Sequence, residues 1–281
     1  MQNTSVSPST FQTWNKALGV IKEKREIFVR IGILTIFLPY LLAVCLLAGM
    51  SNITAHLIQN MKHDSYLSIV DPLFPFLIIY IFIGFLLISS ICTGFISLVK
   101  VAASSFREEQ IDLLPTIKLS LKQTFPHGLV IFMFCSLLSL EQIFLGPFRI
   151  FTFFGLMATV ILVTDQKNCL NSIRQAIFFK YSSPIHGGGF AAAFVLIGLS
   201  ALVFAWEKIM EFIYMIIIQG DEFMNVDRFM WSNPLPGFPF SPMFFLAQLS
   251  YAACGAILLV VIASFLVSLF YSVRSHINHM I

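Results

Sequence analysis

The sequence is short of charge. Only 11% of its 281 residues are Asp, Glu, Lys or Arg, whereas 58% are hydrophobic, and the mean hydropathy is +0.87. Soluble domains carry about a quarter charged residues, and a chain of this size has too little polar surface to cover so much apolar material in water. The apolar runs are continuous and do not alternate every second residue, which excludes a β-barrel. We therefore expect an all-α membrane protein whose main solvent is lipid.

The sequence also lacks the motifs of common active sites. It has no CxxC pair, no HExxH, no Walker lysine loop and no aspartate pair inside the apolar runs. The stretch His186-Gly187-Gly188-Gly189 resembles an esterase oxyanion loop, but no GxSxG nucleophile elbow accompanies it. The cysteines stand singly, at Cys45, Cys92, Cys135, Cys169 and Cys254. We therefore predict no catalytic residue, no cofactor and no metal site, and we expect that the protein is not an enzyme.

Two further features are missing. No basic tract with interleaved aromatic residues is present, so we expect no nucleic-acid partner. The first 27 residues hold no apolar run of the kind that a cleavable signal peptide needs. Small polar residues at the beginning predict a disordered tail over residues 1–10, followed by a single transmembrane domain over residues 11–281.

The sequence contains long apolar runs instead of these motifs. A helix needs about 20 apolar residues to cross the hydrocarbon core, and Pro39 predicts a kink in the first such helix. The run from Leu129 to Val163 is too long for one span and is broken at Leu145–Arg149, so we interpret it as a tight hairpin; a re-entrant pair would look similar. The prediction is six spans, at about 27–50, 72–99, 129–145, 148–164, 188–218 and 244–271.

Lys and Arg divide unequally between the two sides of these spans. Thirteen fall on the side of both termini and four on the other, and basic residues concentrate in cytoplasmic segments. We therefore predict that both termini are cytoplasmic. The thirteen are Lys16, Lys22, Lys24, Arg25, Arg30, Lys100, Arg107, Lys118, Lys122, Lys167, Arg174, Lys180 and Arg274, and the four are Lys62, Arg149, Lys208 and Arg228.

The cytoplasmic segments carry a repeated helical pattern. Apolar residues at helical spacing recur after 56 residues, as Leu114, Ile117, Leu121 and Phe125 and again as Leu170, Ile173, Ile177 and Tyr181. Trp14, Leu18 and Ile21 make a weaker third copy. The pattern predicts three units, each a cytoplasmic amphipathic helix leading into a transmembrane hairpin. These helices either lie on the anionic cytoplasmic leaflet or cap the bundle; the candidate contact residues on them are Lys118, Lys122, Arg174 and Lys180.

The opposite side of the membrane is predicted to be different. Ser51 to Asp71 is expected to form a short polar loop. The segment from Trp206 to Pro242 is the longest on this side, and its distal half, from Phe229 to Phe240, is rich in aromatic residues and prolines, which exclude a regular helix there. Trp231 and Phe238 are therefore candidate contacts with the membrane surface or with a partner protein.

Few ionisable residues fall inside the spans. Glu141 and Arg149 flank the predicted hairpin turn and are a candidate intramembrane pair, either structural or part of a transport route. Glu207 and Glu211 share a helix face. They are either a solvated surface or a carboxylate pair.

The stretch from Leu156 to Ile177, with the turn at Leu145-Gly146-Pro147 before it, resembles the YciC-type bacterial inner-membrane proteins and the membrane domain of some glycerophosphodiesterases. The segment Leu266 to Arg274 is similar to that family's C-terminus. The family's turn has the order Pro-Gly, whereas Gly146 precedes Pro147 here. The resemblance implies a non-enzymatic protein of the bacterial inner membrane and transfers no catalytic residue.

Two kinds of function follow as hypotheses. The first is a scaffold or accessory protein of the bacterial envelope, with the bilayer and either a protein partner or a second copy of the chain as its partners. The alternative is a transporter or lipid-handling protein that uses the bundle, which contains many of the 31 phenylalanines. A hydrolase using Glu207, Glu211 or His186 is disfavoured because charge topology places the histidine and the glutamates on opposite faces.

Overall fold

The computed structural model describes residues 10–60, 66–125, 150–165, 168–182 and 242–278. Every regular element in these ranges is a helix, which confirms the all-α prediction for them. The elements are α1 (Thr10–Glu23), α2 (Arg25–Gly32), the π-helical turn η1 (Ile33–Phe37), α3 (Leu38–Asn60), α4 (Tyr66–Arg107), α5 (Leu113–Gln123), α8 (Ile150–Asp165), α9 (Cys169–Ser182) and α12 (Pro242–Asn278).

Three helical stretches are long and apolar enough to cross a membrane: Arg25–Leu47, Phe74–Arg107 and Gln248–Ser272. They correspond to the first, second and last predicted spans. The fourth predicted span corresponds to α8, whose 16 residues reach about 24 Å, less than the hydrocarbon core of about 30 Å. The spans predicted at 129–145 and 188–218 lie outside the described residues, so the six-span hairpin layout stays a prediction.

The loop predicted from Ser51 to Asp71 is wrong over most of its length. Helix α3 continues to Asn60 and α4 already begins at Tyr66. No Gly or Pro interrupts residues 51–71, and polar side chains alone do not end a helix. At 42 residues, α4 is about 63 Å long, so it extends well beyond the hydrocarbon core.

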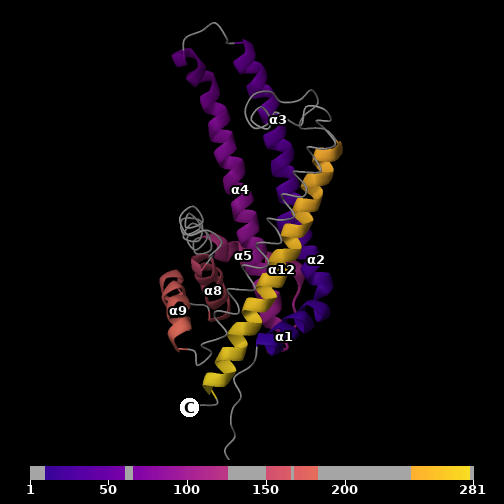
Figure 1. Cartoon of the computed structure of the whole chain (residues 1–281), viewed down its shortest axis with the longest axis vertical. Coiled ribbons are helices and arrows are strands. Elements are labelled where there is room, and N and C mark those ends of the chain that lie inside the picture. The colour runs from indigo at the N-terminus through magenta and orange to yellow at the C-terminus, as the bar shows by residue number, and fades with distance from the viewer. Residues whose placement is uncertain (1–9, 61–65, 126–149, 166–167, 183–241, 279–281) are drawn as a thin grey trace, which may run out of the picture.

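The buried apolar core lies at one end of the molecule. There, α1, α2, α5, α8 and α9 gather around the later parts of α4 and α12 (Figure 1). At the other end, α3 and the first half of α4 rise away from the core and keep large apolar side chains exposed, among them Leu42, Leu46, Phe74, Ile81 and Phe82. Because exposed apolar surface is unfavourable in water, at about 25 cal/mol per Å², this end is suited to contact with lipid.

The first membrane helix changes its hydrogen-bond pattern just before Pro39, where the sequence predicts a kink. The π-helical turn η1 separates α2 from α3 and ends two residues before the proline. Pro39 has no N–H to donate to the carbonyl of Thr35, four residues earlier, and Ser90 Oγ of α4 donates to that carbonyl at 2.8 Å. A Cβ added at Gly94 would collide with the Thr35 side chain. The contact between the first two membrane helices is therefore built around this proline.

Each predicted amphipathic segment forms a helix that packs against an apolar helix. α5 follows α4 and folds back on it, with the hydroxyls of Thr93 and Thr124 2.9 Å apart. α9 follows α8 and packs against it in turn. α1 packs against the last helix, α12, where the Trp14 ring lies 5.5 Å from that of Phe265 (Figure 1). The three pairs follow one scheme, and the third joins the two ends of the chain.

Candidate functional site

Three helices expose an apolar side chain at the same position of the repeat. Phe11 of α1 is 72% exposed, Leu114 of α5 74% and Leu170 of α9 80%. From these positions onward, the order of exposed, half-buried and buried residues is the same over seven residues in all three helices. The repeat predicted from the sequence is therefore also a repeat in the burial of successive residues. The copy at α1, the weakest in sequence, follows the pattern fully.

The two buried positions of this seven-residue pattern hold small residues in each repeat helix: Thr13 and Ala17 in α1, Thr116 and Ser120 in α5, and Ser172 and Ala176 in α9. Two of these residues make the same bond at their helix start. Thr116 Oγ1 donates to the Asp112 carbonyl at 2.6 Å, and Ser172 Oγ donates to the Asn168 carbonyl at 3.1 Å. Small side chains let helices approach closely, so the apolar edge is left on the outside.

The predicted contact residues lie beside this exposed apolar edge where the structure describes them. Lys118 and Lys122 are exposed on α5, and Arg174 is exposed at the equivalent place on α9. Lys180 belongs to α9 as well. An exposed apolar edge flanked by basic residues is typical of a helix in the plane of an anionic membrane surface. The other candidates, Glu141, Arg149, Trp231, Phe238, His186, Glu207 and Glu211, lie outside the described residues.

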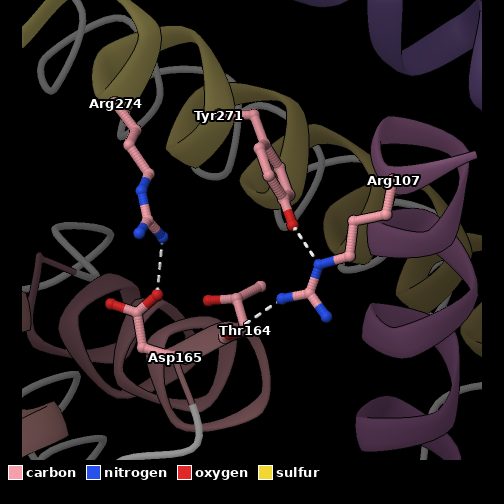
Figure 2. Close-up of a pocket in the computed structure, with 5 residues that line it drawn as sticks. All are labelled: Arg107, Thr164, Asp165, Tyr271 and Arg274. Atoms are coloured by element: carbon pink, nitrogen blue, oxygen red, sulfur yellow. Dashed lines mark hydrogen bonds and ion pairs between the residues drawn. The ribbon is translucent and has the colours of Figure 1, made fainter. Parts of the chain in front are cut away.

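An open polar pocket of about 540 Å³ lies where the C-terminal parts of three apolar helices meet. It is lined by Arg107 from α4, Thr164 and Asp165 from α8, and Tyr271 and Arg274 from α12 (Figure 2). Positions spread over 168 residues of sequence thus converge at one point. The pocket lies at the core end of the molecule, away from the exposed apolar end of α3 and α4.

The two arginines connect the three helices by hydrogen bonds. Arg107 Nε donates to the Tyr271 hydroxyl at 2.9 Å, and Arg107 Nη2 donates to the Thr164 carbonyl at 2.6 Å. Arg274 Nη1 pairs with Asp165 Oδ1 at 2.7 Å (Figure 2). A cation at a carbonyl near the end of α8 also meets the negative end of that helix's dipole. The arrangement holds the ends of the three helices together.

Aromatic rings fix the side chains of this pocket in place. The Tyr271 ring stacks on Phe106 with centroids 4.8 Å apart and an interplanar angle of 6°. Phe270 meets Tyr271 edge to face at 5.6 Å, and the Arg274 guanidinium lies 5.9 Å from the Phe270 ring centroid. Stacked and cation–π contacts of this kind orient both the tyrosine and the arginine.

This pocket was not predicted from the sequence. Arg107 and Arg274 entered only the assignment of the two sides of the membrane, and neither was connected with Asp165. A signal was present, since each of these charges lies shortly after the end of a predicted span, at 99, 164 or 271. Position in the sequence could not indicate that the three runs end at the same place.

The described residues offer little for catalysis. No group of three His, Cys, Asp or Glu side chains among them could hold a metal ion. Burial raises the pKa of the Cys169 thiol above its ordinary value, which keeps it in the unreactive protonated form at neutral pH. Lys100 Nζ is buried without a hydrogen-bond partner in the described part of the chain, but Lys100 does not line the pocket.

No family model, curated protein or solved structure matches the chain. The resemblance to the YciC-type proteins therefore stays a prediction from the sequence, and function has to be argued from the residues themselves.

Proposed function

We propose that this chain is a non-enzymatic scaffold or accessory protein of the bacterial inner membrane, with both termini in the cytoplasm. Its working surface is the set of repeat helices α1, α5 and α9, which lie on the anionic cytoplasmic leaflet and present basic side chains to a partner protein. The observation that supports this proposal is the exposed apolar position that the three helices share at Phe11, Leu114 and Leu170.

The physical argument concerns which side of α5 is covered by protein. In a helix that only caps a bundle in water, leucines would be buried and small polar residues exposed. In α5 the order is reversed, since Ser120 is buried while Leu114 and Leu121 are exposed. Lipid contact removes the cost of exposing these side chains, and nearby Lys118 and Lys122 gain about 1 kcal/mol each at an anionic surface.

Depth-dependent quenching tests the membrane placement. In a variant with all five cysteines replaced by alanine, single cysteines are introduced as Leu114→Cys and Leu170→Cys and labelled with bimane. Lys118→Cys and Arg174→Cys are the matched controls. In vesicles of phosphatidylethanolamine and phosphatidylglycerol with brominated acyl chains, we expect quenching at 114 and 170 and much less at 118 and 174. Equal quenching at all four positions would contradict the proposal.

Co-purification tests the scaffold function itself. The full chain is extracted from native membranes in a mild detergent, and a stably bound protein is expected to accompany it. Lys118→Glu combined with Lys122→Glu and Arg174→Glu should remove that protein, because the basic surface is reversed. Lys62→Glu, which charge topology assigns to the opposite face, is the matched control and should leave it bound. Retention of the partner by the triple variant would exclude the basic surface as its binding site.

Lipid handling is the second candidate function. The arginine-lined pocket at the helix ends favours it, since guanidinium groups near a membrane surface suit anionic lipid head groups. This function needs no partner protein, so the two candidates are separable by the co-purification experiment.

A further inference from the structure

The pocket at the helix ends contains more hydrogen-bond donors than its internal hydrogen bonds use. Arg107 uses Nε and Nη2, and Arg274 uses Nη1, for the bonds to Tyr271, Thr164 and Asp165. A guanidinium has more N–H donors than these bonds require. The Tyr271 hydroxyl accepts from Arg107, so its own proton is available to donate to a ligand. Several N–H and O–H donors therefore border one open space.

The charges of the pocket favour an anion. Two guanidinium groups and one carboxylate line the pocket, so its lining carries a net positive charge. The Arg274 side chain is 53% exposed, and that of Asp165 is 17% exposed, so a ligand can reach Arg274 without breaking into the core. Planar guanidiniums match the oxygens of carboxylates and phosphates in pairs, and the bond to Asp165 uses Nη1 of Arg274.

Aromatic contacts also orient the donor side chains of the pocket. Stacking of Tyr271 on Phe106 and the Arg274–Phe270 contact orient the side chains before any ligand arrives. Side chains that are already ordered lose less conformational freedom when they bind. The volume of about 540 Å³ lies in the range of small-ligand pockets and has room for a phosphate ester.

We propose that Arg107, Arg274 and Tyr271 form a binding site for a phosphate group, either the head group of an anionic phospholipid or a free phosphate anion. Asp165 is the internal counter-ion of Arg274, and a bound phosphate takes its place. A lipid source rests on the membrane placement proposed above, which brings the ends of α4 and α12 to the level of the head groups.

Native mass spectrometry of the full chain in dodecyl maltoside tests this site. The added probes are phosphatidylglycerol, the matched diacylglycerol that lacks the phosphate, and inorganic phosphate as a competitor. We expect retention of phosphatidylglycerol but not of diacylglycerol. Arg274→Gln should weaken retention about tenfold, as expected for the loss of charged hydrogen bonds. Arg25→Gln, which removes an exposed arginine of α2 that does not line the pocket, is the matched control and should bind normally.

Asp165→Asn separates ligand binding from a merely structural role. It removes the carboxylate that competes with the phosphate, so phosphatidylglycerol should bind about fivefold more tightly or better, even if the melting temperature falls. Arg274→Lys keeps the charge but loses the paired geometry, and it should bind at an intermediate level. Unchanged or weaker binding in Asp165→Asn, or equal binding in Arg274→Gln and the wild type, would overturn the proposal.

The competitor identifies the source of the phosphate. Displacement of lipid by millimolar inorganic phosphate assigns the site to a free anion, and resistance to it assigns the site to the lipid. Failure of both probes to bind overturns the site even if bimane at position 114 is quenched by lipid. Phosphate binding without such quenching would overturn the membrane placement and leave the site intact.

Discussion

Pro39 leaves the carbonyl of Thr35 without the donor that a regular helix would supply, and hydrocarbon offers no water in its place. Ser90 of the neighbouring helix donates at 2.8 Å. We expect Ser90→Ala to lower the free energy of unfolding by about 1 kcal/mol. In a Pro39→Ala background the backbone regains an N–H, so the same change should lower it much less. Circular dichroism melting of the wild type, the two single variants and the double variant in detergent measures the coupling between Ser90 and Pro39. Strictly additive effects on the free energy of unfolding would contradict this role of Ser90.

Glu108 ends α4 in a conformation that suits glycine. Its φ is +55°, and the N–H of Glu109 bonds to the Ser104 carbonyl at 3.2 Å, which is the outer bond of a Schellman motif. A left-handed conformation costs a residue with a Cβ about 1–2 kcal/mol. Glu108→Gly should therefore stabilise the protein by about 0.5–1 kcal/mol after the entropy of glycine is subtracted. Glu109→Gly is the control, and it should destabilise; a melting temperature that falls in both variants would be inconsistent with this motif.

At the scale of elements, α5 is inserted with its small residues inward. Ser120 is fully buried and Leu121 is exposed. Ser120→Leu should overpack the contact with α4 and lower the free energy of unfolding by about 1–3 kcal/mol. Leu121→Ser should change it by no more than about 0.5 kcal/mol in detergent. Thermal melting of the two variants measures these losses of stability. A larger loss in Leu121→Ser than in Ser120→Leu would mean that α5 packs against α4 through its leucines.

The sequence predicted α5 and its two relatives for a sound reason. Apolar residues at helical spacing, such as Leu114 and Leu121, identify a helix with two unlike faces. Spacing could not tell which face is covered by protein, because a membrane surface and a protein core both accept leucine. The decisive residues were the small ones, Thr116 and Ser120, whose burial depends on how closely α4 approaches. That distance is a property of the assembled bundle.

At the scale of the whole molecule, hydropathy predicted where the membrane helices are more reliably than where they end. The first, second and last spans agree with the structure, whereas α3 and α4 continue far into the segment that was predicted to be a loop. Polarity marks the exit from lipid, and the end of a helix needs a cap or a breaker. The pocket was beyond prediction for another reason. Arg107, Asp165 and Arg274 come together only because three helices converge.

The pairing of α1 with α12 suggests that the chain is organised as a ring of repeats. α1 is buried in the same pattern as α5 and α9, but it packs against a helix that follows it by more than 200 residues. α5 and α9 pack against the helix that directly precedes them. If the chain is joined from Ile281 to Met1, α12 would precede α1 in the same way.

A circular permutant tests this organisation. The chain is joined at its ends and opened between Glu109 and Gln110, in the connection between α4 and α5. We expect it to insert and melt within a few degrees of the parent, because every repeat helix then keeps its packing partner and the new ends fall outside helices. A permutant opened at Ser90, inside α4, is the control and should not fold, since it divides a membrane helix. Circular dichroism and size-exclusion chromatography in detergent compare the three proteins. If the first permutant aggregates while the parent elutes as a folded protein, the α4–α5 connection is needed as a continuous segment. The pairs α1–α12, α4–α5 and α8–α9 would then not be equivalent.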